Sequence, residues 1–145
     1  MKTKEVMSKK LICCTPTDSC QQAAEMMKKG QIGALPVVQS LDNRRLVGIV
    51  TDRDLSMRLI AEGLAATTPI SNAMTAKPVT CTVDDSLQEC ESRMQKQRVR
   101  RIPIVDHQGL CVGMIAQADI ALREDAKHIQ QTLAAISTPL VQAAA

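Results

Sequence analysis

The amino-acid sequence predicts an α+β protein made of two β-α-β-β-α repeats, related by pseudo-two-fold symmetry and with their sheets packed against each other. The first observation is that short segments recur 67 residues apart early in the repeat and 65 residues apart later in it. The second is that the hydrophobic patterns follow the same order in both copies. The recurring segments are Val6-Met7-Ser8 and Ala73-Met74-Thr75, Leu35–Val38 and Ile102–Val105, Gly48 and Gly113, and Asp54 and Asp119. Repetition at a fixed interval indicates a duplicated supersecondary unit.

These segments place the first repeat at residues 4–62 and the second at residues 73–123. Residues 63–72 form a linker, and residues 124–145 form a C-terminal helix and tail. A repeat of roughly 55 residues is marginal as an independent fold, because it buries too small a share of its surface. We therefore expect the two repeats to bury surface against each other.

Each repeat begins with a short extended piece, at residues 11–15 and 78–83, which leads into a helix. Asp18 or Ser19 is suited to cap the start of the first helix, and Gly30 is suited to cap its end. Apolar residues at helical spacing define the buried face of each helix. They are Cys20, Ala23, Ala24 and Met27 in the first copy, and Leu87, Cys90 and Met94 in the second.

Two short apolar runs separated by a polar turn follow in each copy and predict a hairpin. The runs span residues 34–38 and 46–50, and again 102–105 and 112–115. A final helix is expected from residue 52 to about residue 62, and from residue 118 onward. Pro36 and Pro103 cannot donate a ladder hydrogen bond, so both are expected at a strand edge or a bulge.

The stretch from Asp119 to Ile136 predicts one amphipathic helix that is longer than the repeat requires. Ile129, Leu133 and Ile136 share helical spacing along it. This helix is expected to pack on its own chain or to cross to a partner. Thr138-Pro139 would end it, and residues 140–145 would form a loose tail.

The composition bears on the classes of partner that the chain can bind. Phe, Tyr and Trp are absent, so aromatic stacking of bases is not available. The net charge of +3 is too small to indicate bulk nucleic-acid binding. No apolar run approaches the roughly 18 residues of a membrane span, and the N-terminus does not resemble a signal peptide. We therefore expect a cytoplasmic protein that binds neither nucleic acid nor membrane.

Six cysteines occur in the sequence, and no CxxC pair is present. The plain interpretation is that they are reduced thiols acting as small buried hydrophobic residues. The alternative is a redox or zinc site around Cys13, Cys14 and Cys20. No catalytic constellation is apparent, since there are two histidines and no phosphate-binding loop motif.

Two segments resemble the CBS domain family. One is the Leu/Ile-Pro-Val/Ile-Val segment, and the other is Gly48-Ile49-Val50-Thr51-Asp52-Arg53-Asp54. The resemblance covers Lys4 to Arg123 in both copies. It implies a regulatory module without catalytic activity that binds an adenine nucleotide, AMP or ATP, in clefts between the repeats. It also implies a homodimer of two modules that acts on an unidentified regulated protein, with no metal.

Thr51 and Asp54 suit this chemistry. Thr51 ends a strand and Asp54 lies in the first turn of the next helix, where backbone N–H groups and the helix dipole favour a phosphate. The Asp54 carboxylate can accept from both ribose hydroxyls, and Arg53 adds positive charge. The alternative is that Thr51 and Asp52 only cap the helix while Asp54 favours its dipole.

The resemblance also implies that each cleft takes residues from both repeats. The first cleft would use Thr51, Arg53, Asp54, Gly33, Ala34, Leu35, Pro36, Lys77, Pro78, Val79 and Thr80. The second would use Asp119, Ile12, Thr15, Arg100, Arg101 and Pro103. Ala116 stands where the second copy should have a hydroxyl, so we expect the Asp54 site to be the stronger one.

Two alternative functions remain open. One is a structural or interaction dimer with vestigial clefts, which the substitution at Ala116 and the missing aromatic residues would fit. The other is the thiol or zinc sensor built on Cys13, Cys14 and Cys20.

Overall fold

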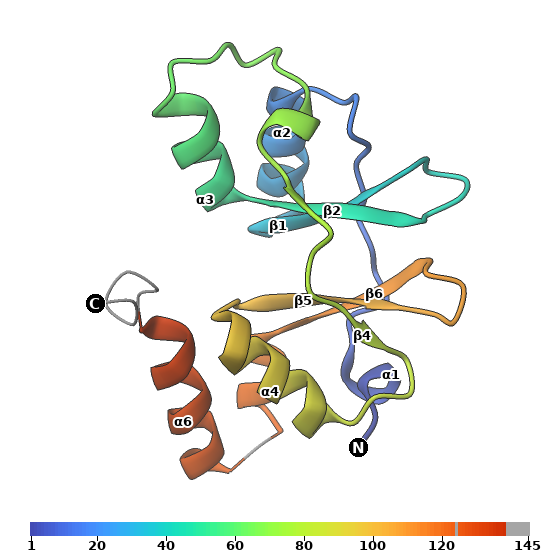
Figure 1. Ribbon diagram of the computed structural model, residues 1–145, viewed down its shortest axis with the longest axis vertical. Helices are drawn as coiled ribbons and strands as arrows, with labels where there is room; N and C mark the ends of the chain where they lie inside the picture. Colours follow the sequence, from blue (N-terminus) through green and yellow to red (C-terminus); the bar gives the residue numbers. More distant parts are fainter. Residues whose placement is uncertain (124, 139–145) are drawn as a thin grey trace. The chain divides into compact units, whose positions relative to one another are not determined.

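The computed structural model describes residues 1–123 and 125–138, which form two compact units (Figure 1). The first-repeat unit contains residues 12–78 and 109–111. The second-repeat unit contains residues 1–11, 79–108 and those from 112 onward. Neither unit is therefore one contiguous stretch of sequence, because the first eleven residues belong with the second repeat. The expected α+β class is confirmed, since helices accompany a three-stranded sheet in each repeat.

The first-repeat unit contains one sheet with strand order β1-β2-β3, and both of its strand pairs are antiparallel. A bulge interrupts the β1–β2 register between Val37 and Val38. Two of its short helical segments are not α-helical, a π-helical turn η1 and a 3₁₀ turn η2. The elements are α2 (Cys20–Gly30), β1 (Ala34–Val38), β2 (Leu46–Thr51), α3 (Asp52–Leu55), η1 (Ser56–Ile60), η2 (Ile70–Asn72) and β3 (Thr75–Ala76).

The second-repeat unit holds the sheet with strand order β4-β5-β6, in which β4 runs parallel to β5. The N-terminal helix α1 and the C-terminal helix α6 both belong to this unit. Its elements are α1 (Thr3–Val6), β4 (Cys81–Thr82), α4 (Leu87–Gln97), β5 (Arg101–Val105), β6 (Cys111–Ala116), α5 (Gln117–Ala121) and α6 (Ala126–Ser137).

Helix α2 begins at a capping box. The Ser19 hydroxyl accepts from the backbone N–H of Gln22 at 3.0 Å, and the Gln22 side chain accepts from the Ser19 N–H at 2.8 Å. Ser19 is therefore the N-cap, whereas the Asp18 carboxylate accepts from the Thr15 N–H at 2.9 Å and closes the preceding turn. The same contacts recur at the start of α4, where they join Ser86 to Glu89 and Thr82 to Asp85.

The predicted C-cap at Gly30 is wrong. Gly30 is the last helical residue, and Gln31 adopts the left-handed conformation that ends α2, with φ of 54°. Arg98 ends α4 in the same way, with φ of 52°. A Cβ at position 30 would lie 2.8 Å from Cδ1 of Ile12, so a larger residue there would displace the end of that side chain.

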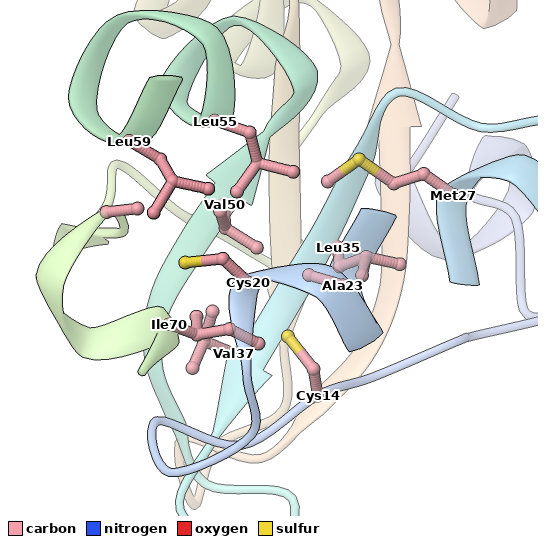
Figure 2. Packing of buried hydrophobic residues seen from close by; sticks show 11 residues of the cluster. Cys14, Cys20, Ala23, Met27, Leu35, Val37, Val50, Leu55, Leu59 and Ile70 are labelled. Carbon is pink, nitrogen blue, oxygen red and sulfur yellow. The ribbon is translucent and has the colours of Figure 1, made fainter. Parts of the chain in front are cut away.

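The core of the first-repeat unit is aliphatic and contains two thiols, as Figure 2 shows. Cys20, Ala23 and Met27 of α2 are buried as predicted. Ala24 is exposed, so its predicted place in the core is wrong, and Met26 packs against the core instead. The cluster is completed by residues from β1, β2 and the following helical turns: Leu35, Val37, Val50, Leu55, Leu59 and Ile70. In the second-repeat unit, Leu87, Cys90 and Met94 are buried as predicted.

Both prolines occupy positions where the ladder is incomplete. Pro36 lies in β1, the outer strand of its sheet, next to the bulge at Val37. Pro103 lies in the central strand β5, so its predicted place at an edge or a bulge is wrong, although β4 pairs only with Ile104 and Val105. The ring nitrogen of proline cannot donate a hydrogen bond, and neither the outer side of β1 nor the short strand β4 requires one from Pro36 or Pro103.

Each sheet receives an extra chain segment that passes directly over a glycine. In the first-repeat unit Thr75 pairs with Ile49, and a Cβ on Gly48 would lie 2.7 Å from Sδ of Met74. In the second-repeat unit Ser8 pairs with Met114. There a Cβ on Gly113 would lie 2.8 Å from Cγ of Met7 and 3.0 Å from its Cβ. The repeated glycine is therefore a contact position for the repeated methionine.

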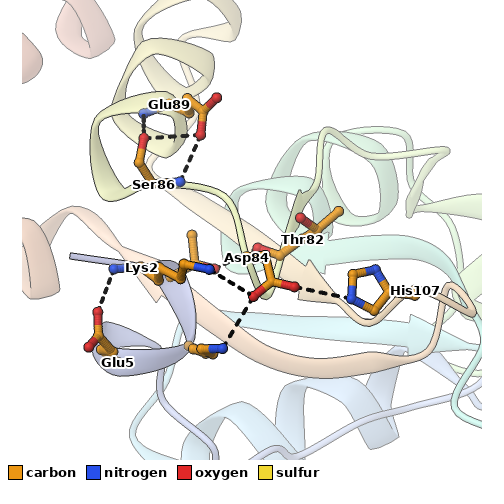
Figure 3. A network of polar contacts seen from close by, with 9 residues as sticks. Lys2, Glu5, Thr82, Asp84, Ser86, Glu89 and His107 are labelled. Carbon is orange, nitrogen blue, oxygen red and sulfur yellow. Dashed lines mark hydrogen bonds and ion pairs between the residues drawn. The ribbon is translucent and has the colours of Figure 1, made fainter.

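Charged contacts hold the N-terminal segment to the second-repeat unit, as Figure 3 shows. The Nζ atoms of Lys2 and Lys4 each lie 3.2 Å from Oδ1 of Asp84, and Nε2 of His107 lies 3.1 Å from its Oδ2. Hydrogen bonds from Lys4 and Lys2 lower the pKa of the Asp84 carboxyl. All four side chains are exposed, so each pair contributes little stability by itself.

The single C-terminal helix expected from Asp119 to Ile136 is wrong, because α5 ends at Ala121 and α6 begins at Ala126. Asp125 caps the new start by accepting from the N–H of His128 at 2.9 Å. Helix α6 packs on α4 of the same chain, where Nε2 of Gln95 donates to Oγ1 of Thr132 at 2.9 Å. Thr132 and Ile136 are buried and Leu133 is exposed. The expected tail at residues 140–145 lies outside the described residues.

A Gly113→Ala substitution should lower the free energy of unfolding by about 1–3 kcal/mol, because the added methyl group overlaps the Met7 side chain. Urea denaturation would measure this loss.

Combining the change with Met7→Ala provides the control. The double variant should lose less stability than the sum of the two single variants, because the truncated side chain makes room for the methyl group. If Gly113→Ala unfolds at the same urea concentration as wild type, the contact between Gly113 and Met7 does not affect the free energy of unfolding.

Candidate functional site

The turn between β2 and α3 is closed by Thr51 and Asp54. The Thr51 hydroxyl accepts from the Asp54 N–H at 3.1 Å, and Oδ2 of Asp54 accepts from the Thr51 N–H at 3.0 Å. The two side chains therefore cap the helix reciprocally, while Oδ1 of Asp52 accepts from the N–H of Arg53 at 2.9 Å. The helix-capping alternative is thus an observed property of this turn.

Capping leaves binding capacity at both side chains. The Thr51 hydroxyl acts as an acceptor in the cap, so its O–H remains available as a donor. The Asp54 side chain is 15% exposed and uses Oδ2 in the cap, while Oδ1 faces Arg58 at 3.8 Å. That distance is too long for a hydrogen bond, so Oδ1 keeps its lone pairs for a ligand.

The start of β1 lies beside this turn. The Gly33 carbonyl accepts from the Asp52 N–H at 3.0 Å, and Ala34 pairs with Thr51 in the sheet. Gly33 is half-buried, whereas Ala34, Leu35 and Pro36 are buried. The Leu35 side chain is part of the hydrophobic core of the unit, which anchors β1 beside the turn.

Arg58 joins this turn to the start of β3 and the residues just before it, and sequence reasoning missed it. Its Nη1 donates to the Ala73 carbonyl and to Oγ1 of Thr75, both at 3.1 Å, in addition to its ion pair with Asp54. The spacing of four residues between Asp54 and Arg58 is a recognisable helical ion-pair signal. Arg53, which was predicted to supply charge, is exposed.

The predicted segment Lys77–Thr80 is divided by the unit boundary. Lys77 has φ of 49°, and its N–H donates to the Val47 carbonyl at 3.4 Å, four residues along β2 from Thr51. Lys77 and Pro78 end the first-repeat unit, and Val79 and Thr80 belong to the second-repeat unit. Within the first-repeat unit, the structure brings together Gly33, Thr51 and Asp54, and it places Lys77 toward the other end of β2.

The second copy has the same turn without a hydroxyl. Oδ2 of Asp119 accepts from the Ala116 N–H at 2.8 Å, and the Gln117 N–H donates to the Arg100 carbonyl at 2.9 Å. Arg123 corresponds to Arg58, but its Nη1 donates to the backbone carbonyl of Asp119 at 3.1 Å. The two copies therefore share the backbone of the site and differ in its side chains.

The remaining residues predicted for the second site are spread over both units. Arg101 is half-buried at the start of β5, and Pro103 is buried within that strand. Ile12 and Thr15 belong to the first-repeat unit. There Ile12 packs against the core, and the Thr15 N–H donates to Asp18.

All six cysteines are free thiols. Burial raises the pKa of Cys14 to about 12, and burial also raises the pKa values of Cys13 and Cys20. Cys14 and Cys20 are fully buried, and their Sγ atoms each lie 3.7 Å from a proline carbonyl oxygen, that of Pro36 or Pro69. Across residues 1–123 and 125–138, no three Cys, His, Asp or Glu side chains gather in a way that could hold a metal ion.

The chain belongs to the CBS domain family, whose model matches residues 4–61 and 70–124. CBS pairs are generally regulatory modules without catalytic activity. The CBS domain-containing protein YhcV of Bacillus subtilis is 35% identical over 121 residues, which cover 83% of this chain and 84% of the relative. The resemblance predicted from the repeated motifs is thereby confirmed. In the part of the chain that the structure describes, no helix is both long and apolar enough to cross a membrane.

Two solved structures extend the comparison. Hypoxic Response Protein I, crystallised with two coordinated zinc ions, is 28% identical with a TM-score of 0.77, covering 86% of this chain and 100% of that one. The CBS domain pair of protein MJ0100, in complex with 5′-methylthioadenosine and S-adenosyl-L-methionine, is 27% identical with a TM-score of 0.75. That match covers 84% of this chain and 94% of the MJ0100 pair.

Cys14 and Cys20 should react slowly with a thiol reagent at pH 8 in the folded protein, because burial raises their pKa values and keeps them protonated. Cys13, which is half-buried, should react before Cys14 and Cys20. Labelling followed by peptide mass spectrometry would give the order, and protein unfolded in urea, where all six react, is the control.

The raised pKa of Cys14 also predicts how stability changes with pH. The unfolded thiol loses its proton near its ordinary value of 9.0, and the folded thiol only near 12. The contribution of Cys14 to the free energy of unfolding is therefore fully present below pH 9 and is lost as pH rises toward 12. Urea denaturation at a series of pH values would measure this loss. Fast labelling of Cys14 in folded protein would contradict both expectations and favour a reactive-thiol function.

Proposed function

We propose that this protein is a regulatory module that binds an adenine nucleotide, AMP or ATP, or a related adenosyl ligand. The observation that carries the proposal is the Asp54 carboxylate, whose Oδ1 is left without a hydrogen bond by a cap that fixes Oδ2. A ribose presents two neighbouring hydroxyl donors, and a charged acceptor makes each such bond worth about 1.5–3 kcal/mol.

The Thr51 hydroxyl supports the same assignment, because its O–H can donate to a phosphate oxygen. Thr51 follows Val50 at the end of β2, and the turn is fixed by the Gly33 carbonyl and by sheet pairing. Binding would therefore cost little conformational entropy at this turn. The adenosyl ligands of the MJ0100 pair, a protein 27% identical to this chain, support the choice of ligand class.

We propose that the Asp54 site is the stronger of the two. Ala116 cannot donate to a phosphate, and no guanidinium lies within ion-pair distance of the Asp119 carboxylate among the described residues. Val79 and Thr80 in the first site, and Ile12 and Thr15 in the second, remain proposed contributions from the other repeat.

A zinc-dependent function receives no support from the donor set of this chain. Hypoxic Response Protein I holds zinc ions, but the residues described for this chain contain no gathered set of three donors. The high thiol pKa values also disfavour the thiolate ligands that zinc requires. We therefore propose the nucleotide function without a metal.

An Asp54→Asn variant should bind its nucleotide at least about tenfold more weakly than wild type, or about 1.4 kcal/mol, because the amide cannot accept as a charged group. Calorimetric titration with AMP, ATP and S-adenosylmethionine would measure the affinity, and the number of sites should be close to one per chain.

The matched control is Asp119→Asn, which makes the same change in the second copy. It should weaken the main binding event much less than Asp54→Asn does. Absence of binding by wild type would overturn the proposed function, and equal losses in the two variants would overturn the ranking of the sites.

We also propose that the chain forms a homodimer. Met57 and Ile60 lie in η1 and are 54% and 72% exposed, and Leu64, which follows the turn at Gly63, is 43% exposed. Exposed apolar side chains close together in the chain favour an association surface, and a self-complementary two-fold contact is the commonest solution for like chains.

An Ile60→Lys variant should shift the protein from dimer to monomer, because two-fold symmetry would place a charge in the interface twice. Sedimentation analysis would measure the mass. Leu41→Lys is the matched control, since Leu41 is also exposed, at 60%, but lies in the loop between β1 and β2. A wild-type monomer, or a control that dissociates equally, would contradict the proposed interface.

A further inference from the structure

The helix after the Asp54 turn departs from regular α-helical geometry. Residues Ser56–Ile60 form a π-helical turn, which the Ala61 N–H closes on the Ser56 carbonyl at 2.9 Å. In the second copy α5 spans Gln117–Ala121, the counterparts of residues 52–56, and ends there. Single π-turns within helices are rare and are frequent at functional sites.

Arg58 lies within this π-turn and is held from both sides. Leu59, its neighbour, is buried in the core, and Nη1 of Arg58 donates to the Ala73 carbonyl and to Thr75 Oγ1, both at 3.1 Å. Ala73 is fully buried, so its carbonyl is a fixed anchor. A guanidinium presents its donors in a planar fork, which makes its position well determined once one nitrogen is bonded.

This fixed guanidinium lies 3.8 Å from Oδ1 of Asp54, the carboxylate oxygen that the helix cap leaves unused. The distance gives electrostatic attraction without consuming the lone pairs of Oδ1 in a hydrogen bond. Asp54 is thus held on one side by the Thr51 N–H and on the other by Arg58. In the second copy Arg123 bonds the Asp119 backbone carbonyl and gives its carboxylate no such support.

We propose that Arg58 is a positioning residue for ribose recognition, which orients the Asp54 carboxylate toward both hydroxyls and makes the first site selective for ribose over deoxyribose. The proposal rests on the proposed nucleotide function of Asp54. Arg58 acts through Asp54, and its anchors at Ala73 and Thr75 tie the ribose acceptor to the start of β3 and the residues just before it. The preference for a complete ribose is therefore a property of the first copy alone.

The experiment compares AMP with 2′-deoxy-AMP by calorimetry in wild type and in Arg58→Gln, Arg58→Lys, Asp54→Asn and the double variant. Wild type should prefer AMP, and Arg58→Gln should weaken AMP binding about three- to thirty-fold while losing most of the preference. Arg58→Lys should recover part of both, because it restores charge without the planar fork. The double variant should be no weaker than Asp54→Asn, since Arg58 acts only through Asp54.

Two variants separate positioning from general support of the fold. Thr75→Val removes one anchor of Arg58 and leaves the pair with Asp54, so the ribose preference should persist. Arg123→Gln makes the matched change in the second copy and should alter neither affinity nor preference. The preference is a ratio of affinities, so partial unfolding of a variant does not imitate its loss.

The outcomes distinguish this inference from the function on which it rests. If wild type binds AMP, Asp54→Asn weakens it, and Arg58→Gln keeps both affinity and ribose preference, the role of Arg58 is overturned and the nucleotide function stands. Losses in Arg58→Gln that add fully to those of Asp54→Asn would also overturn it, because they would show an independent contact. If wild type binds no nucleotide, both proposals fail.

Discussion

The backbone of each central hairpin passes so close to a methionine from a distant part of the chain that only glycine fits at the contact. Met74 lies over Gly48 and Met7 lies over Gly113, and the residue after each methionine pairs with the strand beneath it. This contact decides which segments form each compact unit, because it draws residues 1–11 to the second repeat. The N-terminal charged contacts at Asp84 and the pairing of β3 with β2 both accompany this arrangement.

The helix cap at the end of β2 uses the same two residues that we propose for ligand binding, through different atoms. The reciprocal bonds between Thr51 and Asp54 begin the helix, and a cap of this kind is worth about 1 kcal/mol. One oxygen of Asp54 and the hydroxyl hydrogen of Thr51 are not used by the cap. Capping and ligand binding are therefore compatible functions of one turn, and the same residues can serve the fold before they serve a ligand.

Duplication has kept the backbone of the site and changed its side chains. Both copies bond the first helical N–H to the carbonyl that precedes the hairpin, from Asp52 to Gly33 and from Gln117 to Arg100. The hydroxyl, the π-turn and the ion pair with an arginine occur in the first copy. Two similar backbone turns thus carry different side chains, which is the basis for the proposed ranking of the two sites.

The sequence by itself determined the repeat, its strands and the Thr51–Asp54 turn, because local hydrophobic periodicity and capping residues act over a few neighbours. Only the tertiary structure decided the exchange of Met7 and Met74 between units, the break between α5 and α6, and the burial of Met26 in place of Ala24. It also decided the contacts of Arg58, whose hydrogen-bond partners Ala73 and Thr75 are distant in sequence. Contacts between remote segments leave no periodic signal, so a local pattern cannot predict them.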